Sequence, residues 1–363
     1  MSSKLSKFIP TLLFLATLTV GGFSQKGNGV GEPFVKCSVY RLDLQDSEVI
    51  SNDGEFFYVA EPRGVLRAIN SRDGRTHWTA ELGGSISSTA ASDSGRVFVV
   101  STSTDDSAFL RALSRETGIT EFVVDLNSSQ SPTLAISGET VLISDSNQVA
   151  AFSSKDGAQL WSRSHALPGK GRVIVGSRMA LAEGNKLLLL NLEDGRVGSE
   201  YSFEFPISSV AFANGQTFVG DSRGTIERVS GSSWRYKTGG KIVELAATEF
   251  GLFAASHDNF LYMLNADNGK VIWRRRMSGR IAEGRYLTES SVLIPVVGES
   301  RLFVVDLKDG KLLNQIELEE VVLSRAPIVR RDGSVIVPAN NGLAVYSSRP
   351  CENKNGGELS SPP

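Results

Sequence analysis

The chain has 363 residues, of which 40% are hydrophobic and 21% charged, and its formal net charge is −2. This composition is typical of a soluble globular fold, and the near balance of charge argues against a surface for nucleic acid or anionic membranes. Its 36 glycines indicate a chain that makes many tight turns.

Residues 1–24 have the pattern of a signal peptide for export. Lys4 and Lys7 precede an apolar run over residues 8–20, and small residues lie just before Gln25. The run is short for a membrane span, so we expect cleavage and no transmembrane segment in the mature chain. An uncleaved N-terminal anchor is the alternative. We therefore expect an exported protein.

A two-residue turn ending in glycine recurs along the mature chain, each time after a short apolar run. The pairs are Asp73-Gly74, Thr117-Gly118, Asp156-Gly157, Asp194-Gly195, Asn268-Gly269 and Asp309-Gly310. They recur about every 40 residues, and one double gap holds a degenerate copy at Ser230-Gly231. A period of this length, made of short strands, is the pattern of a β-propeller.

Each of eight copies contains two apolar runs joined by turn-forming residues. Where a copy has the recurring glycine turn, that turn follows the second run. The runs are residues 56–59 and 65–69, 97–100 and 109–113, 141–143 and 149–152, 179–182 and 187–190, 217–219 and 225–229, 252–255 and 260–264, 292–294 and 302–305, and 335–337 and 343–346. Nearly continuous apolar runs are expected where both faces of a blade pack against neighbouring blades. The sequence predicts an all-β, eight-bladed propeller of four-stranded antiparallel blades with almost no helix.

The eighth copy ends before its fourth strand, whereas an unassigned strand pattern covers residues 34–42. We expect this N-terminal segment to complete the last blade, which gives one propeller over residues 34–351 between a flexible leader (25–33) and a disordered tail (352–363). Such closure brings the only two cysteines, Cys37 and Cys351, together. A disulfide between them would stabilise the fold by up to about 5–6 kcal/mol in the loop-entropy model. Two free thiols are the alternative.

The repeats resemble the tryptophan-docking repeat of quinoprotein-like propellers, most clearly over residues 65–78, 149–161 and 260–273. In that family a rim tryptophan packs on a turn of the neighbouring blade. The resemblance assigns this blade-docking role to Trp78, Trp161, Trp234 and Trp273, with Phe122 as a conservative replacement. The fourth and seventh copies have no aromatic residue there, so we expect looser joints after them. The eight repeats are similar to those of quinoprotein dehydrogenases and of the non-enzymatic BamB type of outer-membrane assembly factor.

The sequence contains few residues in patterns that would hold a cofactor or a metal. The chain has no adjacent cysteines, and turn chemistry accounts for acidic residues such as Asp73 and Asp156. The histidines, His77, His165 and His257, have no neighbours at metal-ligand spacing. We therefore predict no catalytic residue, no metal and no cofactor.

Arg274-Arg275-Arg276, with Arg280 and Arg285, form the main basic cluster. Because strand residues alternate between faces, we expect Arg274, Arg276 and Arg280 to bind an acidic protein partner. The predicted function is a monomeric, non-catalytic scaffold for protein–protein interaction in the envelope, and the resemblance suggests outer-membrane protein assembly. The alternatives are a quinone-dependent dehydrogenase and a carbohydrate-binding propeller.

Overall fold

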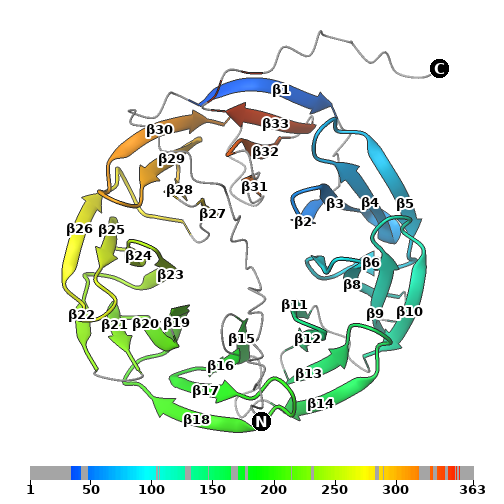
Figure 1. The fold of residues 1–363 in the computed structure, drawn as a ribbon, viewed down its shortest axis with the longest axis horizontal. Helices are drawn as coiled ribbons and strands as arrows, with labels where there is room; N and C mark the ends of the chain where they lie inside the picture. Colours follow the sequence, from blue (N-terminus) through cyan, green and yellow to red (C-terminus); the bar gives the residue numbers. More distant parts are fainter. Residues whose placement is uncertain are drawn as a thin grey trace, which may run out of the picture.

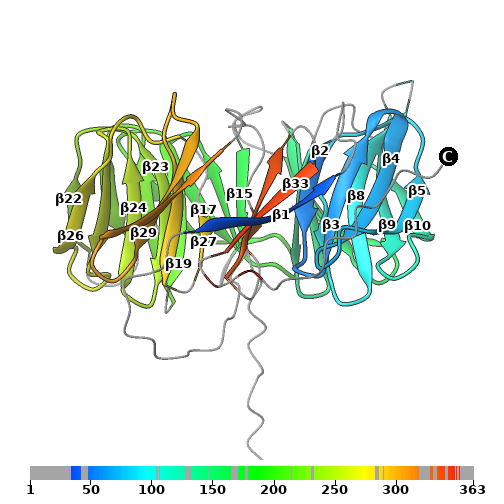
Figure 2. The ribbon, with the colours of Figure 1, turned by 90° about the horizontal axis from the view of Figure 1, so that it is seen from above.

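The structure, a computed structural model, describes residues 34–41, 48–103, 105, 107–126, 132–145, 147–164, 171–175, 179–213, 215–229, 233–282, 286–288, 290–318, 328–329, 333–339, 342–347, 349 and 351. Its strands form eight antiparallel sheets set around a central axis (Figure 1). Seen from the side, the ring is wider than it is deep (Figure 2). The eight-bladed propeller is confirmed, while the predicted signal peptide, leader and tail (1–24, 25–33 and 352–363) lie outside the described residues.

Blades 1 to 4 each begin with the strand nearest the axis and end with a strand at the rim. Blade 1 has β2 (Glu48–Asn52), β3 (Phe56–Glu61), β4 (Val65–Asn70) and β5 (Thr76–Glu81). Blade 2 has β6 (Ser85–Ile86) and β7 (Ala91–Ser92) on one side of β8 (Arg96–Thr102), then β9 (Ala108–Ser114) and β10 (Thr120–Asp125). Blade 3 has β11 (Thr133–Ser137), β12 (Thr140–Ser144), β13 (Gln148–Ser153) and β14 (Gln159–Ser164). Blade 4 has β15 (Gly171–Val175), β16 (Met179–Glu183), β17 (Lys186–Leu190) and β18 (Val197–Ser202).

Blades 5 to 8 continue the ring in the same order. Blade 5 has β19 (Ile207–Ala213), β20 (Gln216–Asp221), β21 (Thr225–Arg228) and β22 (Arg235–Lys237). Blade 6 has β23 (Ile242–Thr248), β24 (Gly251–Ser256), β25 (Phe260–Leu264) and β26 (Val271–Arg276). Blade 7 has β27 (Tyr286–Leu287), β28 (Ser291–Pro295), β29 (Arg301–Asp306) and β30 (Leu312–Glu317). Blade 8 has β31 (Ile328–Val329), β32 (Val335–Ala339), β33 (Gly342–Ser347) and the N-terminal β1 (Val35–Arg41). The single helical element among the described residues is the 3₁₀ turn η1 (Pro62–Gly64).

The core lies between blades rather than within any one of them. The second and third strands of a blade are buried on both faces, which explains their nearly continuous apolar sequence. At the seam of the ring, Phe57 and Val59 of blade 1 pack against Ile336 and Leu343 of blade 8. Because each apolar face is covered by the next blade, the sheets are stable only as a closed set.

The two ends of the chain close the ring by pairing in one blade. Strand β1 runs antiparallel to β33, with Val39 opposite Ala344 and Tyr40 opposite Leu343. The predicted sharing of the last blade is therefore confirmed.

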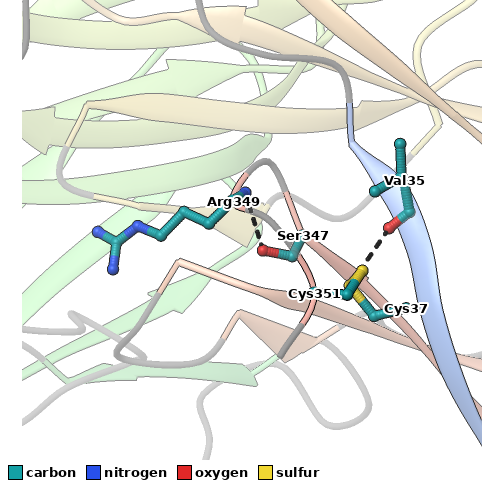
Figure 3. The surroundings of a disulfide bond; sticks show 5 residues. All are labelled: Val35, Cys37, Ser347, Arg349 and Cys351. Atoms are coloured by element: carbon teal, nitrogen blue, oxygen red, sulfur yellow. Dashed lines mark hydrogen bonds between the residues drawn. A yellow bond between two sulfur atoms is a disulfide. The ribbon is translucent and has the colours of Figure 1, made fainter. Parts of the chain in front are cut away.

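A disulfide joins Cys37 in β1 to Cys351, which follows β33, with their Cα atoms 5.4 Å apart (Figure 3). The Cys37 sulfur also lies 3.8 Å from the carbonyl oxygen of Val35, and the Arg349 N–H donates to Ser347 Oγ in the turn that leads to Cys351. Closure therefore has both a hydrogen-bonded and a covalent part.

Candidate functional site

Four tryptophans connect neighbouring blades by the same hydrogen bond. The indole N–H of each donates to a backbone carbonyl of the following blade over 2.8–2.9 Å. The pairs are Trp78 with Arg115, Trp161 with Leu192, Trp234 with Ala266, and Trp273 with Leu307. Each accepting carbonyl lies three residues before the glycine of the recurring turn, so the sequence repeat places both partners.

The glycine of the turn is the second half of each contact. Gly195 has a φ of +67°, which L side chains rarely adopt, and a Cβ added there would lie 2.6 Å from the Trp161 ring. Gly118, Gly269 and Gly310 face their tryptophans in the same way. The indole therefore lies flat against a turn that only glycine permits at this distance.

The remaining joints lack this hydrogen bond. Phe122 packs against Gly157 and has no N–H to donate. Ser199 and Asn314 occupy the tryptophan position in blades 4 and 7, because they follow the same register shift in the outermost strand. The register of β1 gives Ser38 that position in blade 8. Docked joints therefore follow blades 1, 3, 5 and 6, and joints without an indole hydrogen bond follow blades 2, 4, 7 and 8.

An ion-pair network strengthens the joint between blades 1 and 2. Arg115 Nε donates to Asp53 Oδ2 over 2.6 Å, and its Nη2 donates to Glu55 over 2.8 Å. The guanidinium also lies 5.0 Å from the Phe56 ring centroid. Burial raises the pKa of Asp53, but hydrogen bonds from Arg115, the Phe56 N–H and Tyr58 outweigh it and hold that pKa below its ordinary value. Sequence reasoning missed this network, because its members are about 60 residues apart in unrelated turns.

The predicted arginines fall into two groups. Arg274 and Arg276 are exposed on the same face of β26, whereas Arg275 lies on the other face and donates to the Gly310 carbonyl over 2.9 Å. Arg280 lies beyond the strand, and its Nη2 donates to Nδ1 of His257 over 2.9 Å. The structure therefore brings Arg274 and Arg276 together and places Arg280 in the connection to blade 7, where its carbonyl accepts from the Val297 N–H at 2.8 Å. Arg285 lies outside the described residues.

Aromatic rings lie beneath these arginines. The Arg274 guanidinium is 5.8 Å from the Phe260 ring centroid, and Tyr236 of blade 5 contacts Tyr262 edge-on at 5.7 Å. Burial, followed by the hydrogen bond and negative charge of Asp258, raises the pKa of the Tyr262 phenol above its ordinary value. Sequence reasoning did not identify this aromatic layer, because apolar runs at strand spacing are first explained as core.

Acidic residues of the recurring turns make local backbone contacts. Asp73 accepts from the Arg75 N–H at 3.0 Å and Asp194 accepts from the Arg196 N–H at 3.0 Å. In the part of the chain that the structure describes, no three His, Cys, Asp or Glu side chains gather as metal ligands. The His77 ring stacks on Phe56 at 4.8 Å, and His165 lies outside the described residues. The backbone contacts of Asp73 and Asp194 agree with the turn chemistry expected for the acidic residues.

Eight blades, closed by the chain ends and joined by rim tryptophans, define the tryptophan-docked class of β-propeller. The family model described as outer membrane protein assembly factor BamB matches residues 38–178 and 185–353. The chain belongs to this family.

Solved structures confirm the likeness of the fold. The crystal structure of BamB from Moraxella catarrhalis is 14% identical, with a TM-score of 0.64 over 86% of this chain and 97% of that chain. The computationally designed Ika8 protein is 13% identical, with a TM-score of 0.66 over 87% and 99%. No curated protein sequence matches the chain. Within the described ranges, no helix is long and apolar enough to span a membrane.

Proposed function

We propose that this protein is a non-catalytic scaffold that binds protein partners in the bacterial cell envelope and contributes to the assembly of outer-membrane proteins. The observation that carries the proposal is the family match, which extends from residue 38 in the closing strand to residue 353. A disulfide between the chain ends supports an oxidising location outside the cytoplasm. The predicted signal peptide at residues 1–24 agrees with that location.

The geometry suits a binding scaffold. Indole hydrogen bonds and a disulfide hold the blades in fixed relative positions, so little conformational entropy is lost when a partner binds. Among the described residues, the outermost strand of every blade pairs along one edge only. The opposite edges and the loops beside them are surfaces that a partner chain can pair with.

The test is depletion of the protein in its source organism. We expect a smaller folded fraction of β-barrel proteins in the outer membrane, measured by their heat-dependent mobility in gels, and recovery with the wild-type gene. An unchanged folded fraction would contradict the assembly role.

The two alternative functions are tested with the purified protein. It is mixed with pyrroloquinoline quinone and calcium, and separately with envelope glycans. Dye-linked dehydrogenase activity would overturn the non-catalytic assignment. Saturable binding of a glycan, with no envelope protein bound, would show that the partner is a carbohydrate rather than a protein. Neither result is expected.

A further inference from the structure

We propose that the rim strand β26 of blade 6 binds an extended peptide segment with carboxylates at alternate positions, which adds to the blade as a fifth strand. The inference rests on the proposed scaffold function and specifies the chemistry of a partner. Its carrying observation is the pair Arg274 and Arg276, which face outward from the same side of an open strand edge.

The residue types at two equivalent rim positions can be compared across all eight blades. These are the first and third residues after the docking position, and they share one face of the outermost strand. In chain order from blade 1 to blade 8 they are Thr79 and Glu81, Val123 and Asp125, Ser162 and Ser164, Glu200 and Ser202, Arg235 and Lys237, Arg274 and Arg276, Gln315 and Glu317, and Val39 and Arg41. Two cations occur together only in blades 5 and 6.

The cations of blade 5 already have partners within their own blade. Arg235 lies opposite Glu227 on β21, and the two side chains form an ion pair at 3.1 Å. Lys237 donates to the Arg223 carbonyl and to Thr225 Oγ1. In blade 5, therefore, a carboxylate neutralises one of the two charges, and hydrogen bonds to neutral oxygens hold the other cation against its own blade.

In blade 6 the residues opposite the two arginines are aromatic. Arg274 lies opposite Tyr262 and Arg276 opposite Phe260, so the third strand supplies no carboxylate there. The carboxylate of Asp258 in the preceding turn accepts from the Tyr262 hydroxyl at 2.7 Å and from the Phe260 N–H at 3.1 Å. It also accepts from the Gly239 N–H at 2.7 Å. Among the described residues, neither arginine has an ion pair within 4.0 Å, which leaves their charge for an external anion.

Within the described ranges, β26 pairs only with β25, so its backbone has hydrogen-bonding groups without a strand partner at the same two residues. The Met277 N–H donates to the Asn259 carbonyl at 2.8 Å, which fixes the phase of the ladder between β25 and β26. Because bonded and non-bonded pairs alternate in an antiparallel ladder, the N–H and C=O of Arg274 and Arg276 point away from β25. An added strand would bond to these groups and place its own side chains opposite the guanidiniums.

The spacing selects the ligand. Two residues along a strand span about 6.6–6.8 Å, so carboxylates at alternate positions of an extended peptide meet both arginines. A second copy of β26 would bring four cations together, which disfavours self-pairing at this edge. The formal net charge of −2 gives the whole chain no general attraction to an anionic bilayer. An acidic peptide is therefore the occupant that the surface fits.

The experiment measures fluorescence anisotropy of a fluorescein-labelled peptide of alternating glutamate and valine, added to the full-length protein. We expect saturable binding that weakens with salt and falls about tenfold in Arg274→Gln/Arg276→Gln. Arg235→Gln/Lys237→Gln is the matched control at the same positions of blade 5 and should bind like the wild type. Arg274→Lys/Arg276→Lys keeps the charge and should retain most of the affinity, which separates loss of binding from loss of folding.

Two further probes test the mode of binding. The same peptide with N-methyl groups on alternate amides should bind poorly, and hydrogen exchange at Arg274 and Arg276 should slow when the unmodified peptide is bound. Equal affinity of the glutamine-for-glutamate peptide, or equal affinity of the Arg274→Gln/Arg276→Gln variant, would overturn the proposal. Binding to phosphatidylglycerol vesicles that requires both arginines, without binding to the peptide, would assign the surface to lipid and also overturn it.

Different assays test the proposed scaffold function and the proposed peptide-binding surface. Impaired β-barrel assembly after depletion, rescued equally by the wild type and by Arg274→Gln/Arg276→Gln, would keep the scaffold function and reject the strand addition as its partner contact. Peptide binding by the purified wild type with no effect of depletion would reject the assembly role and leave the binding surface in place.

Discussion

The joint between blades 3 and 4 and the joint between blades 4 and 5 differ at the rim and agree inside. In the first, buried Trp161 donates to the Leu192 carbonyl and packs on Gly195. In the second, exposed Ser199 stands at the equivalent position. Both joints nevertheless have a buried apolar cluster between their inner strands. Tryptophan docking is therefore a feature of the rim, added to a separate apolar cluster that each of these joints has between its inner strands.

The seam between blades 8 and 1 replaces the indole with a covalent bond. In blade 1 the register shift skips His77, the residue before Trp78. In blade 8 the register shift skips Cys37, and Ser38 follows it. The disulfide thus forms at the one residue of the rim strand that lies outside the ladder. A seam that joins the two chain ends gains most from a covalent bond, since the unfolded chain would otherwise separate them by 314 residues.

The largest expected effect comes from breaking the seam. Cys37→Ser should lower the free energy of unfolding by up to about 5–6 kcal/mol, because the disulfide no longer restricts the unfolded chain. Guanidinium denaturation measures the change. Cys351→Ser and the reduced wild type should give the same curve, since all three lack the same bond. A midpoint unchanged from the oxidised wild type would contradict this account.

Removing an indole from a docked joint should have the next largest effect. Trp161→Ala should cost about 3–5 kcal/mol, the usual range for loss of a buried aromatic side chain. Trp161→Phe keeps most of the packing and loses one hydrogen bond, so it should cost about 1 kcal/mol beyond any repacking. Urea denaturation followed by circular dichroism separates the two. Equal losses in both variants would assign the joint to the hydrogen bond alone.

The glycine half of the same joint can be broken separately. Gly195→Ala places a methyl group against the Trp161 ring and forces an L residue into the left-handed region. We expect a loss of about 2 kcal/mol from these two sources of strain, measured by the same denaturation. Combined with Trp161→Ala, the clash disappears, so the two losses should not add. Strict additivity would show that the glycine and the indole act independently.

The ion pair between blades 1 and 2 should make this docked joint sensitive to acid. Asp53→Asn should cost about 1.5–3 kcal/mol at neutral pH, since it removes a charge-assisted hydrogen bond from Arg115. Because folding lowers the pKa of Asp53, its stabilisation is present above the ordinary aspartate value of about 3.9 and is lost as pH falls through the folded-state value. The difference between wild type and variant should therefore shrink in acid. Asp73→Asn, in an exposed turn, is the control, and a gap that persists in acid would contradict the linkage.

The features that could be predicted from the sequence are those encoded locally. Gly74 and Trp78 are four residues apart, so one short pattern sets the turn, the register shift and the docking residue of a blade. The missing fourth strand of the last copy and the unassigned strand at residues 34–42 together predicted closure, and closure predicted the cysteine pair. Repetition made each of these signals visible several times.

Contacts between side chains of different blades could not be predicted. Arg115 and Asp53 are 62 residues apart, and each lies in a turn whose residue types already suit the turn. Arg274 has no ion pair among the described residues because the register places Tyr262, rather than a glutamate, opposite it. A sequence pattern gives the charge and the face of a strand but not the residue opposite on the neighbouring strand, so the absence of a carboxylate opposite Arg274 and Arg276 became evident only in three dimensions.

The smallest expected effect is at the undocked joint, and it completes the comparison. Ser199→Ala should change the free energy of unfolding by less than about 0.5 kcal/mol. Ser199 is exposed, so truncating its side chain removes no buried packing. The measurement is the same urea denaturation used for Trp161→Ala, one blade away at the equivalent position. A loss above about 1 kcal/mol would mean that the serine carries a joint contact of its own, and the division of the rim into docked and undocked joints would then be wrong.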